Sequence, residues 1–162
     1  MPYALLALVL VILDQVVKYL VLTYIPLGGY VPFLPHIACL TYVQNTGAAF
    51  SMFSQHTWIL ALISLIMSVV LAVALWKNFF THPLGKVTLA LLLAGAVGNL
   101  IDRTLRGFVV DMFQLLFMNF AVFNVADICV VVGGIAAAAY YLLLADKLEH
   151  KEAPHGTADA DR

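Results

Sequence analysis

Long stretches without charged residues are the feature of this sequence that most restricts its fold. Hydrophobic residues make up 64% of the 162 residues and charged residues only 10%, whereas charged residues make up about 25% of an ordinary globular domain. A single water-soluble core cannot bury that much apolar surface. A run of about 20 apolar residues, by contrast, is long enough to cross a hydrocarbon layer of about 30 Å. The composition therefore predicts a membrane protein, and the length predicts one domain.

Four apolar stretches of this chain are long enough to be membrane-spanning helices. They cover about residues 3–24, 58–76, 87–103 and 122–145. The first stretch lacks a basic start and a small-residue cleavage site, so we expect a retained helix and not a cleaved leader. Tryptophans bound the second stretch, as is typical of residues at membrane interfaces. The expected fold class is a mainly α membrane protein with four transmembrane helices, which form a single integral membrane domain over residues 1–145.

The segments outside these stretches differ in composition. Residues 25–56 contain prolines and glycines, which break helices, and no Lys, Arg, Asp or Glu, which suits the interfacial layer of a membrane. Residues 37–44 are strand-like, so we expect a small β-rich segment that rests on the membrane. Residues 146–162 form a polar tail that we expect to be disordered.

Basic residues predict how the chain is oriented in the membrane. Lysines are concentrated on one side of the predicted spans, and two arginines lie on the other. The lysines are Lys77, Lys86, Lys147 and Lys151, and the arginines are Arg103 and Arg106. Because cytoplasmic loops carry an excess of basic residues, both termini and the polar tail are expected in the cytoplasm. The β-rich segment and the linker at residues 104–121 are then expected on the outer, extracytoplasmic face.

Three aspartates, Asp102, Asp111 and Asp127, lie around the end of the third apolar stretch and the start of the fourth. Asn99 precedes Asp102 by three residues and Asn124 precedes Asp127 by three, a spacing that puts both groups on one face of a helix. Ionisable groups at membrane depth are costly, so they indicate a site. Both apolar stretches meet the outer face here, and the linker can bring Asp111 to the same level.

Paired carboxylates in a poorly solvated site have a defined chemistry. They cannot both ionise readily, so the pair shares a proton. Such a pair can deprotonate a water for attack on a peptide carbonyl and then protonate the leaving amine, which is the chemistry of an aspartic protease. Asp111 and Asp127 are the favoured pair. Asp102 is followed by Arg103 and is interpreted as a buried ion-pair or capping group, although the residues alone leave it a rival for the pair.

Asp14 and Lys18 are a further charged pair, inside the first apolar stretch. They lie four residues apart in the favourable order for a helical ion pair. Either they neutralise each other or they act beside the site. In both cases the two side chains should face protein or water and not lipid.

Other functions remain open at this point. A proton-coupled transporter would use Asp14, Asp102 and Asp127 as a relay, but it predicts polar residues through the full depth, and the second apolar stretch has only two serines as polar groups. A packing or assembly protein would not need paired aspartates. The sequence has no GxSxG or HExxH block, so we expect no serine or metal hydrolysis and no cofactor. A net charge of -1 offers no basic surface for nucleic acid.

Several blocks of the sequence resemble the signature blocks of lipoprotein signal peptidase, also called signal peptidase II. They are residues 14–18 (DQVVK), 44–50 (QNTGAAF), 98–103 (GNLIDR), 109–111 (VVD) and 123–127 (FNVAD). They follow the family's order and extend over nearly the whole chain, so together they are a specific signal. The sequence departs from the family at Met112 and Ile128, where members often have an aromatic residue and a serine.

The resemblance implies a function and a set of site residues. It implies an aspartic endopeptidase of the bacterial cytoplasmic (inner) membrane that removes signal peptides from prolipoproteins, cutting on the amino side of the diacylglyceryl-modified cysteine. The partners would be this substrate and membrane lipid. Asp111 and Asp127 would be the catalytic pair, near the outer face. The residues expected to line or support the site are Asn45, Asn99, Arg103, Asn124, Asp14 and Asp102.

Overall fold

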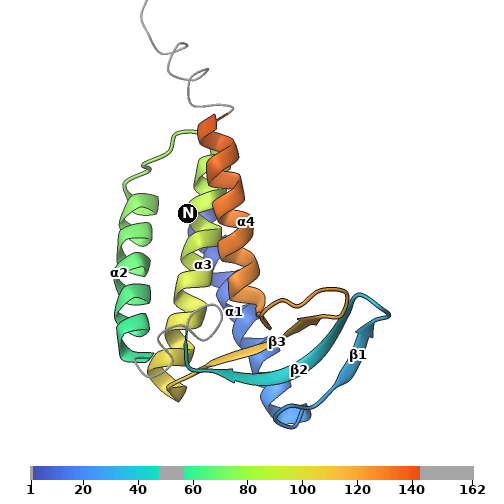
Figure 1. The fold of residues 1–162 in the computed structure, drawn as a ribbon. Helices are drawn as coiled ribbons and strands as arrows, with labels where there is room; N and C mark the ends of the chain where they lie inside the picture. Colours follow the sequence, from blue (N-terminus) through green and yellow to red (C-terminus); the bar gives the residue numbers. More distant parts are fainter. Residues whose placement is uncertain (1, 48–56, 143–162) are drawn as a thin grey trace, which may run out of the picture.

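The computed structural model describes residues 2–47 and 57–142, which form four helices and three strands. The elements are α1 (Pro2–Tyr24), β1 (Val31–Leu34), β2 (Ala38–Asn45), α2 (Thr57–Trp76), α3 (Pro83–Arg106), β3 (Val109–Leu115) and α4 (Val125–Tyr140). The helices lie side by side, and the strands form a sheet that projects from one end of them (Figure 1). The predicted tail and the last part of the predicted β-rich segment, residues 48–56, lie outside the described residues.

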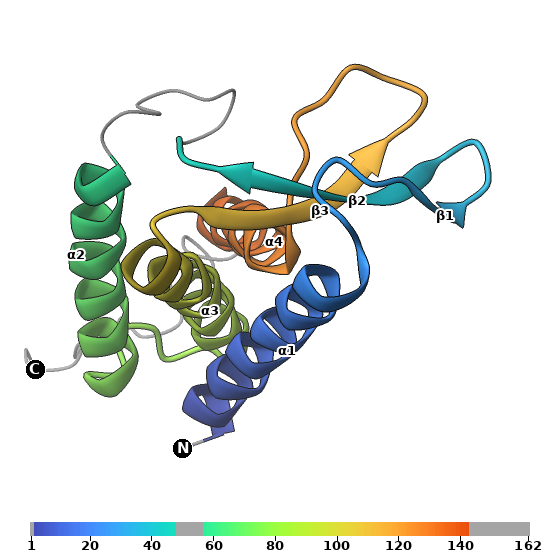
Figure 2. The same cartoon turned by 90° about the horizontal axis from the view of Figure 1, so that it is seen from below.

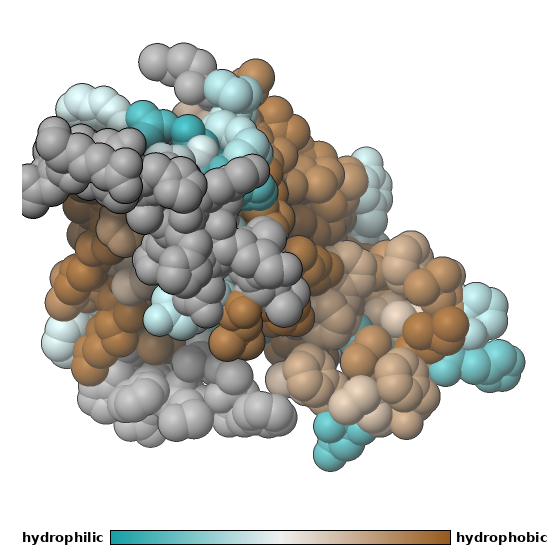
Figure 3. Space-filling view, turned by 90° about the horizontal axis from the view of Figure 1, so that it is seen from above, coloured by the Kyte–Doolittle hydropathy of each residue, from teal (hydrophilic) through white to brown (hydrophobic). Residues whose placement is uncertain are grey.

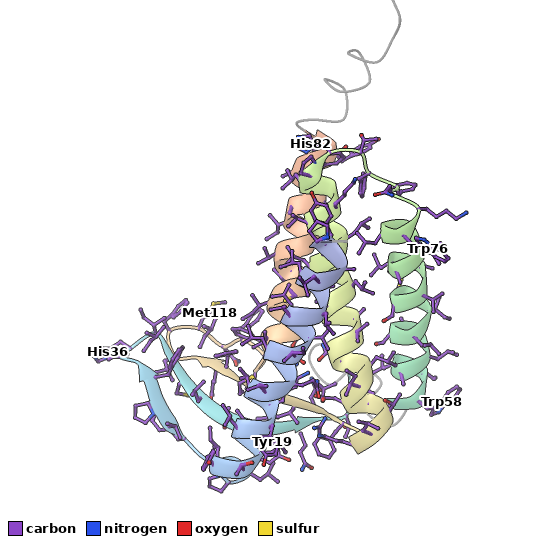
Figure 4. The ribbon with its side chains drawn as sticks, turned by 180° about the vertical axis from the view of Figure 1, so that it is seen from behind. Tyr19, His36, Trp58, Trp76, His82 and Met118 are labelled. Carbon is purple, nitrogen blue, oxygen red and sulfur yellow. The ribbon has the colours of Figure 1, made fainter. Side chains whose placement is uncertain are left out.

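Within the described residues, three helices are long and apolar enough to cross a membrane. These are α1 with 23 residues, α2 with 20 and α3 with 24, and each of them covers one of the predicted apolar stretches. Trp58 and Trp76 mark the two ends of α2 (Figure 4), where they are 65% and 83% exposed. Helices that are apolar on their exposed faces suit a lipid environment, so the chain is a multi-pass membrane protein.

The fourth helix begins later than predicted. α4 has 16 residues in the described chain and starts at Val125, whereas the predicted stretch began at residue 122. Phe123 pairs with Phe113 in a β-bridge, and Asn124 caps the helix, so neither residue belongs to it. Residues 143–145 of the predicted span lie outside the described residues. The described length of α4 is therefore shorter than a full membrane span.

α3 packs against α1, α2 and α4 (Figure 2), and small residues allow this close packing. At Gly95 an added Cβ would lie 2.5 Å from the carbonyl oxygen of Ala126, in α4. At Gly98 an added Cβ would lie 2.7 Å from Oδ2 of Asp14, in α1. Real Cβ atoms do not come this close, so the backbone of α3 touches both neighbours only because these positions lack a side chain.

The sheet is antiparallel, with β2 between β1 and β3. The strand predicted over residues 37–44 is confirmed as β2, whereas β3 lies within residues 104–121, which were predicted as a linker. The register between β2 and β3 pairs Val43 with Asp111 and Asn45 with Val109, which brings Asn45 close to Asp111. A core cluster fixes the sheet to the end of α1. It consists of Val21, Ile25, Tyr42, Val110 and Met112.

The far end of the sheet projects beyond the helices. His36 and Met118 lie on this projection (Figure 4). Viewed from the end that carries the α2–α3 turn, its surface is mostly apolar with hydrophilic residues at the rim (Figure 3). Large apolar residues here are 45 to 65% exposed. They are Phe33, Leu34, Ile37, Phe117 and Met118. Apolar residues gathered in this way on one projection suit contact with a lipid surface.

The packing of α3 predicts that Gly98→Ala destabilises the protein. The new methyl group would meet a carboxylate oxygen of Asp14 and displace it, and overpacking of this kind costs about 1–3 kcal/mol. Gly134→Ala is the matched control, because a Cβ there meets no atom within 4 Å. Thermal unfolding in detergent should show a lower Tm for Gly98→Ala and no loss for Gly134→Ala. Equal Tm values would contradict the close approach.

Candidate functional site

The chain between β3 and α4 folds back so that Asp111 and Asp127 meet. The carbonyl of Phe123 accepts from the N–H of Phe113 at 2.8 Å, and the N–H of Phe123 donates to the carbonyl of Phe113 at 3.1 Å. This bridge returns the chain to the strand that carries Asp111. α4 then begins at once, with Asp127 in its first turn. The two carboxylates come from different elements, as the sequence predicted.

Asn124 connects the two carboxylates. Its Nδ2 donates to Oδ1 of Asp111 at 2.6 Å. Its Oδ1 accepts from the backbone N–H of Asp127 at 2.9 Å, and its own N–H donates to Oδ2 of Asp127 at 3.2 Å. The second pair of bonds is a capping box at the start of α4. The expectation that Asn124 and Asp127 share a helix face is therefore wrong, because Asn124 lies just outside the helix.

Asn99 and Asn45 supply the other hydrogen bonds of the carboxylates. Nδ2 of Asn99 donates to Oδ1 of Asp127 at 2.8 Å. Nδ2 of Asn45 donates to Oδ2 of Asp111 at 2.9 Å, and its Oδ1 accepts from the N–H of Gly47 at 2.9 Å. Each carboxylate oxygen therefore accepts a hydrogen bond from an amide group. Such bonds stabilise a charged carboxylate away from bulk water.

A buried cluster of charges lies behind the carboxylates. Nζ of Lys18 is 2.9 Å from Oδ2 of Asp14 and 3.0 Å from Oδ2 of Asp102. Nη1 of Arg106 is 2.6 Å from Oδ1 of Asp102. The side chains of Lys18, Asp14 and Asp102 are at most 1% exposed. The two cations, Lys18 and Arg106, balance the charges of the two aspartates. The predicted pair of Asp14 and Lys18 is confirmed, and Asp102 joins it.

Arg103 is not the ion-pair partner of Asp102 that the sequence suggested. Neighbouring residues on a helix point in different directions, so Asp102 faces the charge cluster and Arg103 faces away from it. Nη1 of Arg103 donates to Oγ of Ser64 at 3.4 Å, and Nη2 donates to the carbonyl of Gly47 at 3.3 Å. Its Nε is buried and has no hydrogen-bond partner among the described residues.

Among the described residues, two cavities border Asp111, and one of them also borders Asp127. The larger one has a volume of about 450 Å³. Its polar lining consists of Asn45, Asn99, Arg103, Asp111 and Asp127, and its apolar lining includes Phe120, Val122, Phe123, Ile128, Val130 and Val131. The second cavity, of about 390 Å³, also borders Asn45 and Asp111, and residues 43–46 and 119–122 line it. Asp111 therefore lies where a largely apolar cavity meets a second one that contains more polar groups.

Burial, together with the charge of Asp127, raises the pKa of Asp111 to about 6. Hydrogen bonds from Asn45 and Asn124 and the charge of Lys18 act in the opposite direction. A carboxyl group with this pKa keeps its proton at a pH where an ordinary aspartate has lost it. The pair can therefore hold one acid and one base at the same time.

The residues predicted for the site fall into two groups. At the carboxylates and their cavity lie Asn45, Asn99, Arg103, Asp111, Asn124 and Asp127. Asp14 and Asp102 lie behind them in the charge cluster. Sequence reasoning missed Gln15, whose Nε2 donates to both of these aspartates at 3.1 and 3.3 Å. The sequence feature that could have indicated Gln15 is its position directly after Asp14.

Met112 and Ile128 are the residues at which the sequence departs from the family pattern, and they occupy different places. Met112 is 0% exposed in the core under the sheet, with its side chain among apolar residues. Ile128 is 41% exposed and lines the larger cavity. A change of residue type at Ile128 therefore alters the cavity, whereas one at Met112 alters the packing of the sheet.

Fold and site together define a multi-pass helical membrane protein whose paired carboxylates lie where the helices meet a small sheet. Comparison with known proteins identifies its family. The model of the family described as signal peptidase (SPase) II matches residues 6–143. The chain is 44% identical to the lipoprotein signal peptidase of Enterococcus faecalis over 155 residues, which are 96% of this chain and 95% of that protein. It is 42% identical to the lipoprotein signal peptidase of Lactiplantibacillus plantarum over 131 residues, 81% of this chain and 87% of that one.

Solved structures agree with this assignment. One bacterial membrane enzyme, determined at 2.3 Å, superposes with a TM-score of 0.82 at 31% identity, over 99% of this chain and 94% of that one. Another, determined at 1.9 Å, gives a TM-score of 0.79 at 33% identity, over 89% and 94%. The chain belongs to the signal peptidase II family.

The charge cluster predicts that Asp102→Asn lowers stability before it affects chemistry. An amide at this position presents N–H groups to Lys18 or Arg106, and breaking a buried pair costs about 3–5 kcal/mol. Thermal unfolding should show a lower Tm. Lys77→Gln, at an exposed lysine far from the cluster, should stay within about 0.5 kcal/mol of the parent. A fully stable Asp102→Asn protein without turnover would instead place Asp102 in the reaction.

Proposed function

We propose that Asp111 and Asp127 are the catalytic pair of this protein, a signal peptidase II family protease that removes signal peptides from prolipoproteins. Membership of the signal peptidase II family supports the reaction. The observation that carries the catalytic roles is the bridge through Asn124, which bonds to both carboxylates beside a cavity. In this mechanism one carboxylate takes a proton from a water that attacks the peptide carbonyl, and the other carboxyl group donates a proton to the leaving amine.

The two cavities support a lipid-bearing peptide as substrate. The larger cavity is lined by valines of α4 and by aromatic residues of the β3–α4 connection, which suits acyl chains. The second cavity has amide side chains and strand backbone in its lining, which suits an extended peptide. Both meet at Asp111. We infer that cleavage falls on the amino side of a diacylglyceryl-modified cysteine, with its acyl chains in the larger cavity or in the bilayer.

Arg103 has the features of a substrate-binding residue in this scheme. Its guanidinium group lines the larger cavity together with both aspartates. Its buried Nε lacks a partner among the described residues, and a peptide carbonyl of the substrate can accept from such a donor. Asn45 and Asn99 line the same cavity and hold the carboxylates in place.

The proposed setting is the bacterial cytoplasmic membrane, with both termini in the cytoplasm and the site near the outer face. The α2–α3 turn carries Lys77, and Lys86 lies in the first turn of α3. This end of the helices is opposite the sheet (Figure 4, where His82 marks the turn). The positive-inside rule puts that end in the cytoplasm. We further propose that α4 is the fourth span of a single domain over residues 1–145, and that the exposed apolar residues of the sheet rest on the membrane surface.

Loss of either proposed catalytic carboxylate tests the assignment. Asp111→Asn and Asp127→Asn should each lower kcat on a diacylglyceryl lipopeptide by about 10²- to 10⁴-fold, because neither amide can transfer the proton. Both proteins should still fold. Gln114→Ala, at an exposed residue of the same strand as Asp111, is the control and should cleave at the parent rate. Near-normal turnover in either Asn variant would refute the pair.

The pH dependence follows from Asp111. Its pKa is raised, so the proton that the pair needs is present below about pH 6 and is lost as the pH rises through that range. The alkaline limb of kcat/KM should therefore reflect an apparent pKa far above that of an ordinary carboxyl group. Asn45→Ala removes a hydrogen bond that lowers this pKa, so the limb should move to higher pH. Thr104→Ala, at an exposed residue of α3, should leave it in place. If the alkaline limb of kcat/KM lies at the same pH in Asn45→Ala as in the parent, Asp111 is not the group that titrates there.

A further inference from the structure

Lys18 is buried where α1 meets α3, and each hydrogen of its ammonium group has an acceptor. Among the described residues these acceptors are Oδ2 of Asp14 at 2.9 Å, Oδ2 of Asp102 at 3.0 Å and Oδ1 of Asn99 at 3.0 Å. The side chain is 0% exposed, so water does not compete for these hydrogens. The two carboxylates account for charge balance. The bond to Asn99 adds nothing to that balance and needs another explanation.

This bond determines how the amide of Asn99 is oriented. An ammonium group donates and cannot accept, so the atom of Asn99 that faces Lys18 has to be the oxygen. The amide nitrogen then faces Oδ1 of Asp127, 2.8 Å away. A flipped amide would place its N–H groups against the ammonium and its oxygen against a carboxylate, two unfavourable contacts in a buried place. Lys18 therefore decides which end of Asn99 meets Asp127.

The orientation of Asn99 also affects the hydrogen bonds of Asp111. Oδ1 of Asn99 also accepts from Nδ2 of Asn124 at 3.2 Å, and that nitrogen donates to Oδ1 of Asp111 at 2.6 Å. Of the two bonds to Asn99, the one from Lys18 is shorter and comes from a charged donor, so it is the stronger constraint. A chain of two amides thus runs from a buried cation to both carboxylates.

We propose that Lys18 is a positioning residue for the aspartate pair, which acts through Asn99 and Asn124 to hold Oδ1 of both aspartates as hydrogen-bond acceptors. The Oδ2 atoms of Asp111 and Asp127 accept from Asn45 and from the N–H of Asn124, so all four carboxylate oxygens meet donors of fixed orientation. Carboxylates held in this way present a defined orientation to the attacking water and the peptide, which is where positioning contributes to rate. This inference rests on the catalytic roles proposed above.

Charged groups reach the pair from each element around it. Lys18 comes from α1, Arg103 from α3, Asp111 from β3 and Asp127 from α4. The remaining charges, on Asp14, Asp102 and Arg106, belong to the cluster around Lys18. The ammonium of Lys18 lowers the pKa of Asp111. Loss of this ammonium should therefore move the alkaline limb of kcat/KM to higher pH, an effect that a purely structural lysine would not have.

The test removes the donor while it preserves the charge balance. Lys18→Met in an Asp14→Asn background takes out one cation and one anion together, and it is compared with Asp14→Asn alone. Relative to that single variant, the double variant should lose about 10- to 100-fold in kcat, since misplaced groups cost this much, with little change in KM and an alkaline limb at higher pH. Arg106→Met is the matched control. It removes the other cation from Asp102 but touches neither amide, so it should keep the parent kcat and pH profile.

Two outcomes would overturn the positioning role. One is a folded double variant with the kcat and pH profile of Asp14→Asn. The other is failure of every Lys18 variant to fold, Lys18→Arg included, while Arg106→Met folds, because Lys18 would then serve stability alone. Asp111→Asn is assayed in parallel. Turnover by Asp111→Asn would refute the proposed function itself, whereas an inactive Asp111→Asn beside an unaffected double variant would refute only the role of Lys18.

Discussion

A buried set of charges, Asp14, Lys18 and Asp102, is the constraint on which the rest of this structure depends. Each of these groups costs several kcal/mol at such depth without a partner, so the helices that carry them have to meet. The cluster also holds the other elements of the site. Oδ1 of Asp14 accepts from the N–H of Ala126 in α4 at 2.9 Å, and Oδ2 of Asp102 accepts from the N–H of Val110 in β3 at 3.0 Å. One cluster therefore joins α1, α3, β3 and α4 at the end where the aspartate pair lies.

Close packing of the helices makes these short bonds possible. Helices in a membrane gain little from burying apolar side chains against each other, so they depend on close contact and interhelical hydrogen bonds. Gly95 and Gly98 remove the side chains that would separate α3 from its neighbours. Beside Gly98, the N–H of Ala126 in α4 donates to Oδ1 of Asp14 in α1, and a side chain at Gly98 would meet both residues. Small residues therefore allow a short distance between the helices, and the buried charges form their bonds across that short distance.

Amide groups, and not cations, make the direct hydrogen bonds to the two carboxylates. Asn124 bonds to both, and Asn99 and Asn45 bond to one each, so every oxygen has a donor while the pair keeps a raised pKa at Asp111. A directly paired lysine or arginine would lower that pKa, and Asp111 would lose its proton at a lower pH. The same arrangement disfavours a proton relay across the membrane, because the four aspartates belong to one connected set of ion pairs and hydrogen bonds and are not spread along the helices.

Sequence alone determined the apolar spans, the strand β2, the pair of Asp14 and Lys18, and the aspartates around which the site forms, because these depend on composition and on short spacings along the chain. Only the tertiary structure decided which partner each charge takes. Asp102 bonds to Lys18, 84 positions earlier in the chain, and not to Arg103 beside it. Asn124 acts as a helix cap because Phe123 first returns to β3. Such contacts depend on how helices and strands meet in space, and a spacing between neighbours in the sequence does not contain that information.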